Sequence, residues 1–233
     1  MKIGVVGAGV MGLATARVLA QRAYELWREL EQESGRTLLE LDGLVDVQRV
    51  PRRRVEALRG AGVPLEEVEP ADAEALVRIL NPIIEARVHT AFDTKFSIEA
   101  ERDYILNFPR RGIWKVAIRW PDRRLVGFQI MEPFAMYTTA FDHVGTLGTY
   151  VDLELRRQGV AKSLFEATFE AARRKGYEKV FTFVRADNPV ALQTYLGQGF
   201  LVIGTAHKQA RIDGRYIDQI LIEKSLEQPA GGR

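Results

Sequence analysis

The stretch that decides the fold is Arg156-Arg157-Gln158-Gly159-Val160-Ala161-Lys162. It follows the apolar run Gly145–Val151 and opens an amphipathic helix over residues 163–176. A small-residue loop between a strand and a helix favours phosphate, because free backbone N–H groups and the helix dipole both attract anions. The loop has neither the Gly-Lys-Ser/Thr of a P-loop nor the glycine spacing of a dinucleotide site. It therefore predicts another kind of diphosphate-bearing ligand, and its three basic side chains add to the attraction.

The residues downstream of this helix narrow the choice. A strand pattern, Lys179–Arg185, is followed in order by Asn188, Tyr195 and the pair Gly199-Phe200. Together with the loop, these residues resemble the GNAT superfamily of N-acetyltransferases, most closely its phosphinothricin-type and related small-amine branch. The resemblance covers about residues 66–226 and implies a GNAT-type mixed α/β sheet flanked by helices. The alternative is an ordinary helix N-terminus beside a buried tyrosine.

Periodicity and turn signals place the elements of this domain. Asp213-Gly214 is a strong hairpin signal, and Asn81-Pro82 is expected to interrupt a helix. Ser97 is expected to cap the next helix, with Ala100 near its third position. The expected elements are helices at 72–80, 97–108 and 163–176, a hairpin of 113–120 with 125–132, strands at 145–151 and 179–185, a helix carrying Tyr195 after the second of these strands, and a hairpin of 200–212 with 215–223.

The resemblance also implies a cofactor, acetyl-CoA, and roles for individual residues. Backbone groups of Thr149, Tyr150 and Val151 are expected to bond the pantetheine arm, and the amides of residues 158–162 to hold the pyrophosphate. Asn188 is expected to bond the pantetheine region. Tyr195 is expected near the thioester sulfur, where it would protonate the departing thiolate. The alternative for Tyr195 is a tyrosine that only packs on an amphipathic helix.

Acetyl transfer requires a base to deprotonate the amine, and here the sequence departs from its relatives. Thr146 stands where phosphinothricin-type enzymes commonly have a glutamate. Glu132 and His143 are our candidates, and Asp142 and Asp152 are also near in sequence. His143 is attractive because its ordinary pKa lies near neutrality, although it could equally satisfy a loop carbonyl. The acceptor pocket is expected at an aromatic segment, which contributes Phe134, Tyr137 and Phe141; these could instead fold onto the core.

The N-terminal segment carries a different signal. Gly7–Gly12 reads Gly-x-Gly-x-x-Gly between a strand pattern and a helical run, as in a dinucleotide site. The second strand and its acidic residue are missing, because residues 21–34 are helical instead. With residues 25–44, this motif resembles truncated sarcosine-oxidase-like, FAD-dependent amine oxidases. We predict a small incomplete Rossmann-like βα segment at 1–63 that does not bind FAD, an acetyltransferase domain at 64–228, and a loose tail at 229–233.

Composition excludes several classes of function. The chain has 233 residues, 46% of them apolar, with 33 basic against 31 acidic side chains, so no nucleic-acid surface is expected. It has no cysteine and three scattered histidines, which predicts no disulfide and no metal site. No apolar run approaches the ~20 residues that span a bilayer. We expect no membrane partner, and coenzyme A chemistry indicates the cytoplasm.

The sequence thus predicts an enzyme, an acetyl-CoA-dependent N-acetyltransferase acting on the primary amine of an amino acid or analogue. A non-catalytic acyl-CoA sensor is the alternative, and an FAD-dependent amine oxidoreductase is a weaker one. Relatives are often dimers, so a homodimer is possible, although no heptad pattern indicates one. The acceptor amine and the general base are left open.

Overall fold

The computed structural model describes residues 65–119 and 122–226 of the 233-residue chain. The sequence of elements is the one that the turn and periodicity signals predict, with one strand added at the start. The elements are β1 (Leu65–Glu67), η1 (Pro70–Asp72), α2 (Ala73–Glu85), α3 (Ile98–Leu106), β2 (Ile113–Arg119), β3 (Arg124–Pro133), η2 (Thr139–Phe141), β4 (Val144–Val151), η3 (Leu153–Leu155), α4 (Val160–Arg174), β5 (Lys179–Arg185), α5 (Pro189–Leu196), β6 (Leu201–Ile212) and β7 (Arg215–Ser225).

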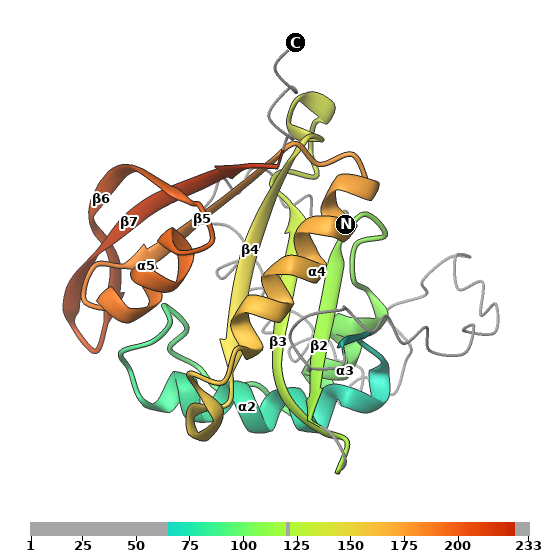
Figure 1. Cartoon of the computed structure of the whole chain (residues 1–233). Helices are drawn as coiled ribbons and strands as arrows, with labels where there is room; N and C mark the ends of the chain where they lie inside the picture. Colours follow the sequence, from blue (N-terminus) through green and yellow to red (C-terminus); the bar gives the residue numbers. More distant parts are fainter. Residues whose placement is uncertain (1–64, 120–121, 227–233) are drawn as a thin grey trace, which may run out of the picture. The chain divides into compact units, whose positions relative to one another are not determined.

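The described strands form one mixed sheet in the order β1-β2-β3-β4-β5-β7-β6 (Figure 1). β4 and β5 run parallel, and every other neighbouring pair in this sheet is antiparallel. The α4 helix supplies the crossover between the two parallel strands, as a parallel connection requires. The mixed α/β sheet flanked by helices is therefore confirmed.

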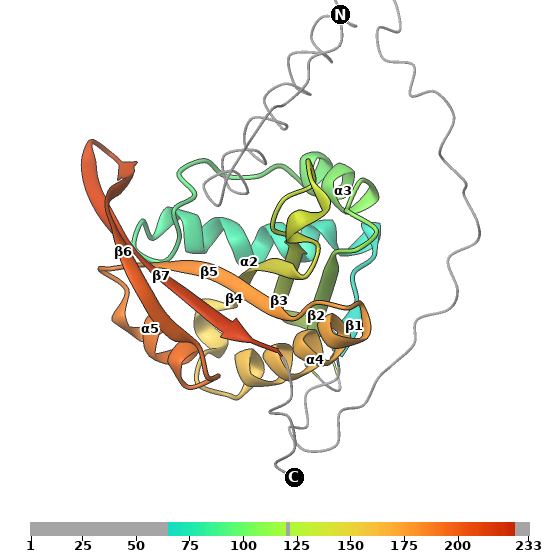
Figure 2. The ribbon, with the colours of Figure 1, turned by 90° about the horizontal axis from the view of Figure 1, so that it is seen from above.

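Helices cover both faces of the sheet, as Figure 2 shows: α2 and α3 lie over one face, α4 and α5 over the other. On the α4 face the core has two parts. One includes Phe165, Tyr195 and Phe200, and the other is built around Leu164. Successive side chains of a strand point to opposite faces of the sheet, so every second residue faces the same helix layer.

The predicted interruption of the first helix is wrong. The α2 helix continues through Pro82 to Glu85, and Ile79, Ile83 and Ile84 are all buried. Pro82 removes one backbone donor, but its side is exposed and burial of the isoleucines outweighs that loss. Asn81 does not end the helix either: its side-chain amide both donates to and accepts from the backbone of Phe96, at 3.0 and 2.9 Å.

Other local predictions are confirmed. Ser97 caps α3 by accepting a hydrogen bond from the Ala100 backbone N–H at 3.1 Å, and both predicted hairpins form. β1 is absent from the prediction, because a strand of three residues is too short to show a periodic pattern. The predictions for residues 1–63 and for the tail lie outside the described residues.

Candidate active site

The site begins where β4 and β5 separate. Their ladder has three pairs, the last joining Thr146 to Phe181, and beyond it the strands diverge (Figure 1). β5 continues to pair with β7, while β4 continues to pair with β3 as far as Val151. At the fork, the Thr182 hydroxyl donates a hydrogen bond to the Leu147 carbonyl at 2.7 Å. Past this point β5 no longer covers the edge of β4.

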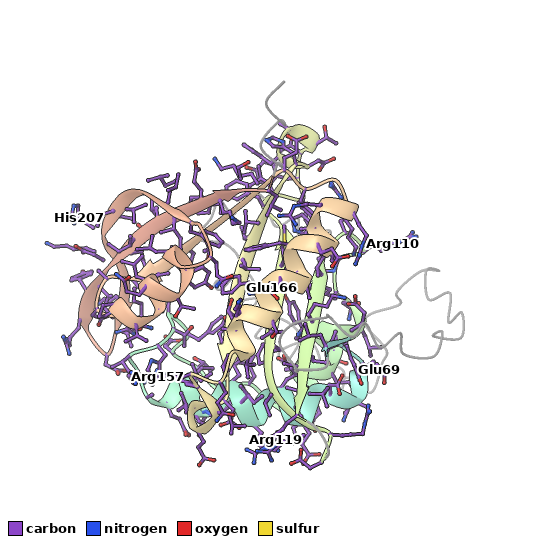
Figure 3. All side chains as sticks on the ribbon, viewed as in Figure 1. Glu69, Arg110, Arg119, Arg157, Glu166 and His207 are labelled. Carbon is purple, nitrogen blue, oxygen red and sulfur yellow. The ribbon has the colours of Figure 1, made fainter. Side chains whose placement is uncertain are left out.

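That edge leads into the basic loop. After β4 the chain makes the short turn η3, and then Arg157 and Gly159 adopt positive φ angles of 61° and 80°. A Cβ at Gly159 would meet nothing within 4 Å, so glycine is favoured here by the backbone conformation. The loop is exposed, and Figure 3 shows Arg157 on it.

The α4 helix starts at Val160 without a side-chain cap and with no acidic residue in its first turn. Its N–H groups at residues 160–162 precede the first intrahelical bond, which Ser163 makes to the Gly159 carbonyl at 3.1 Å. Uncapped donors, the helix dipole and neighbouring arginines together suit an anion. The structure thus brings the predicted phosphate loop to the end of the separated β4 edge.

Tyr195 both packs in the core and presents its hydroxyl to this edge. Its ring lies 5.2 Å from the rings of Phe165 and Phe200, edge to face. Its hydroxyl donates a hydrogen bond to Thr149 Oγ1 at 3.2 Å. Burial raises the pKa of Tyr195 to about 12, although hydrogen bonds with Thr149 act to lower it. The phenol is therefore protonated at neutral pH and can donate a proton.

Two nearby residues were not found from the sequence. Gln129 on β3 donates from Nε2 to Thr149 Oγ1 at 2.8 Å; only the register between β3 and β4 reveals this contact. His89, in the α2–α3 loop, lies with Nε2 3.3 Å from an Arg156 guanidinium nitrogen. Burial, then the charges of Arg156 and Arg185, lower the pKa of His89, and burial also lowers that of Arg156.

Asn188 is the N-cap of α5. Its side-chain oxygen accepts from the Ala191 backbone N–H at 3.2 Å, and its Nδ2 lies 3.4 Å from the His89 carbonyl. Asn188 thus lies beside His89, which in turn contacts Arg156 of the basic loop. The side-chain oxygen of Asn188 is already bonded in the cap of α5. Its role toward a pantetheine arm stays a prediction.

The base candidates separate in space. Glu132 lies directly opposite Thr146 on the neighbouring strand, on the same face of the sheet. His143 is exposed just before β4, and six residues of extended strand, about 20 Å, separate it from Thr149. The structure does not bring His143 to the Tyr195 hydroxyl. Asp142 pairs with Arg111 at 3.1 Å and Asp152 with Arg124 at 2.8 Å.

The predicted acceptor aromatics only partly gather. Phe134 lies 5.2 Å from Phe141 and 5.9 Å from Phe181, measured between ring centroids. Because Phe181 is the last β5 residue paired with β4, this cluster marks the fork between the strands. Tyr137 is 60% exposed and takes no part in the cluster.

Other site types find no support in the described residues. No group of three metal-ligating side chains gathers there. His207, within β6, is exposed and pairs with Asp218 on β7 (Figure 3). No helix in the described part of the chain is both long and apolar enough to cross a bilayer.

Comparison with known families agrees with this geometry. The model of the acetyltransferase (GNAT) family matches residues 83–200, just over half of the 233-residue chain. The chain belongs to the GNAT acetyltransferase family. The match runs from the end of α2 through α5 and so contains the fork, the basic loop and Tyr195. A comparison with curated proteins gives no match.

Solved structures share the fold of this GNAT domain. A ribosomal-protein-alanine N-acetyltransferase from Brucella melitensis is 25% identical, with a TM-score of 0.65 over 69% of this chain and 98% of that one. An N-acetyltransferase from Staphylococcus aureus Mu50 is 19% identical, with a TM-score of 0.65 over 70% and 98%. A phosphinothricin acetyltransferase from Sinorhizobium meliloti, in complex with AcCoA, is 18% identical, with a TM-score of 0.64 over 74% and 92%.

The family match begins at residue 83, so it does not bear on the amine-oxidase resemblance of residues 1–63. None of the three structures named above is an oxidoreductase. That resemblance has no support from the comparisons, and FAD has none either.

Proposed function

We propose that this GNAT enzyme transfers an acetyl group from acetyl-CoA to the primary amine of a small molecule, an amino acid or an analogue. One observation carries the proposal: the separated edge of β4 leads, through η3 and the basic loop, to the uncapped N-terminus of α4. A ligand with an amide-containing arm and a diphosphate matches these two features in the same order: the arm fits the edge of β4, and the diphosphate fits the N-terminus of α4. The Sinorhizobium meliloti relative, which shares the fold, is a complex with AcCoA.

The residues present fit acetyl-CoA in two parts. Backbone groups along residues 149–151 would bond the pantetheine amides as an added strand does. The amides of residues 158–162 would hold the pyrophosphate, and Arg156, Arg157 and Lys162 would balance its charge. Asn188 would stand beside the arm, next to His89.

Two groups would carry the protons. Glu132 would accept a proton from the attacking amine, since it lies directly across from Thr146, where relatives place a glutamate. Tyr195 would give its proton to the departing thiolate. A carboxylate beside the fork favours catalysis over the role of a passive acyl-CoA sensor. The cluster of Phe134, Phe141 and Phe181 supports an acceptor with a modest apolar side chain.

We also propose residues 64–228 as the limits of the acetyltransferase domain. At one end, Leu65 is 2% exposed and pairs with Ala117 on β2. At the other, Leu226 is 1% exposed and its N–H donates to the Glu178 carbonyl at 2.7 Å. Both ends of the described segment are thus tied to the rest of the domain, which supports these limits.

The test is a calorimetric titration with acetyl-CoA of wild type, Gly159→Glu and Gly176→Glu. Gly159 and Gly176 share a φ of 80° and open space around a Cβ, and they flank the two ends of α4. Glutamate should strain the backbone equally at both positions, but only at 159 should it repel a pyrophosphate. We expect binding by wild type and Gly176→Glu and its loss in Gly159→Glu. No binding by wild type, or equal binding by both variants, would overturn the proposed cofactor site.

Turnover is tested separately with a panel of primary amines, following the release of free thiol. Glu132→Gln should reduce kcat while acetyl-CoA binding is kept. Binding without turnover of any amine would remove the catalytic part of the proposal.

A further inference from the structure

A row of polar side chains crosses the face of the sheet beneath α4, one strand after the next. Glu67 on β1 pairs directly with Lys115 on β2, Lys115 with Gln129 on β3, and Gln129 with Thr149 on β4. Directly opposed residues in a sheet point to the same face. The row ends at Tyr195, whose hydroxyl contacts Thr149.

The middle of this row is buried. Lys115 is 5% exposed and Gln129 is 0% exposed, in a layer that also contains apolar side chains such as Leu164. Burying polar groups costs free energy unless they are bonded, so a fold that keeps them needs a reason. Only Glu67, whose side chain is 62% exposed, reaches solvent at the far end.

The contacts along the row have a direction. Lys115 forms an ion pair with Glu67. Gln129 donates from Nε2 to Thr149 Oγ1 at 2.8 Å, and its buried Oε1 has no hydrogen-bond partner within the described part of the chain. Lys115 stands opposite Gln129 on β2, with its ammonium paired to Glu67, and a positive charge on that side attracts the amide oxygen. This charge therefore favours the orientation in which the NH₂ group faces Thr149.

This orientation limits what the Thr149 hydroxyl can do. A hydroxyl has two lone pairs and one hydrogen. Gln129 occupies one lone pair and Tyr195 the other in this structure. The hydrogen of Thr149 is the remaining donor, and it can turn toward the phenol oxygen once Tyr195 has given its own proton away.

We propose that Gln129 and Thr149 are positioning residues that hold the Tyr195 hydroxyl at the edge of β4 and then stabilise the phenolate that forms when its proton passes to sulfur. The inference rests on the proposed acetyl transfer. As the C–S bond breaks, its electron pair goes to sulfur, the Tyr195 O–H bond breaks, and an S–H bond forms. The Thr149 hydroxyl then donates to the phenolate oxygen, with its own oxygen still held by Gln129. Solvent returns a proton to Tyr195 before the next turnover.

The first test is a double-mutant cycle in kcat. Thr149→Val and Gln129→Met remove the hydrogen-bonding groups at similar volume. Each should lower kcat about 10- to 100-fold, the range for one hydrogen bond to a developing charge, with a smaller change in KM for acetyl-CoA. In a Tyr195→Phe background neither should lower kcat further. Losses that multiply in that background would overturn the proposal, as would a wild-type kcat in Thr149→Val.

Two further variants separate this role from a structural one. Thr149→Ser keeps a hydroxyl and should restore most of the kcat that Thr149→Val loses. Thr168→Val is the matched control: Thr168 is also 0% exposed, and its Oγ1 has no partner among the described residues, so its loss should leave kcat unchanged. A Thr149→Ser variant as slow as Thr149→Val would contradict the positioning role.

The second test does not depend on turnover. Selective ¹³Cζ-tyrosine labelling of the full chain allows the Tyr195 signal to be assigned by its loss in Tyr195→Phe. Thr149→Val and Gln129→Met should both shift this signal, whereas Thr168→Val should not. An unchanged signal in both variants would overturn the inference. If wild type binds acetyl-CoA but acetylates no amine, the proposed function fails while the NMR result still decides the hydrogen-bond arrangement.

Discussion

Replacing Arg185 with alanine should loosen the loop that borders the site. The Arg185 side chain is 4% exposed. One of its guanidinium nitrogens donates to the carbonyls of Arg87 and Thr90, at 2.6 and 3.0 Å. The other two nitrogens bond both carboxylate oxygens of Asp187, at 2.8 and 2.7 Å. These bonds attach the α2–α3 loop, including His89, to the end of β5.

The expected loss of stability depends on which of these hydrogen bonds water can replace. The Asp187 side chain is 44% exposed, so water can replace much of that ion pair. The two carbonyl bonds come from a buried charge, and hydrogen bonds of this kind contribute about 1.5–3 kcal/mol each. Since the carbonyls are only half-buried, we take the lower end, about 3 kcal/mol in all. For a domain of this size that lowers the melting temperature by roughly 6–12 °C.

The assay is thermal unfolding followed by near-ultraviolet circular dichroism, with Arg174→Ala as control. Arg174 is 51% exposed and pairs with Glu170 on the surface of α4, so its loss should cost less than about 1 kcal/mol. Arg185→Ala should also weaken acetyl-CoA binding, because His89 would no longer be held against Arg156. Equal melting temperatures for the two variants would refute the reasoning.

Two other predictions concern packing and pH. Gly127→Ala should destabilise the domain and weaken acetyl-CoA binding, because the new Cβ would lie 2.9 Å from the Val160 side chain at the start of α4. Gly204→Ala is the control and should do neither, because its Cβ would lie 3.9 Å from the nearest atom. Chemical unfolding measures the stability of both variants, and calorimetry measures their binding of acetyl-CoA. The pKa of His89 is lowered from 6.5 in the fold, so the unfolded chain binds its proton more readily. Neutral His89 therefore contributes to the free energy of unfolding above about pH 6.5, and this contribution is lost as the pH falls through the folded-state pKa. His89→Gln should flatten the profile of unfolding free energy against pH between 5 and 8, and parallel profiles would contradict this assignment.

Local signals in the sequence predicted much of this domain. Ser97 capping α3 and Asp213-Gly214 turning the β6–β7 hairpin are determined by residues within a few positions of each other. The glycine of the basic loop belongs to this group, since its φ of 80° is a local requirement. Pro82 shows the limit of such reasoning: its local preference to end a helix is outweighed by burial of α2 against the sheet.

The sequence by itself thus determined the cap of α3, the two hairpins and the glycine of the basic loop, because caps, turns and apolar periodicity act between near neighbours in the chain. Only the tertiary structure decided which side chains meet across strands. The contact of Gln129 with Thr149 and the distance of His143 from Tyr195 depend on strand register, and a shift of one residue would reverse every face. The link of His89 to Arg156 likewise joins segments 67 residues apart, and Arg185 and Asn188 hold the loop that carries His89 against the end of β5 and the start of α5.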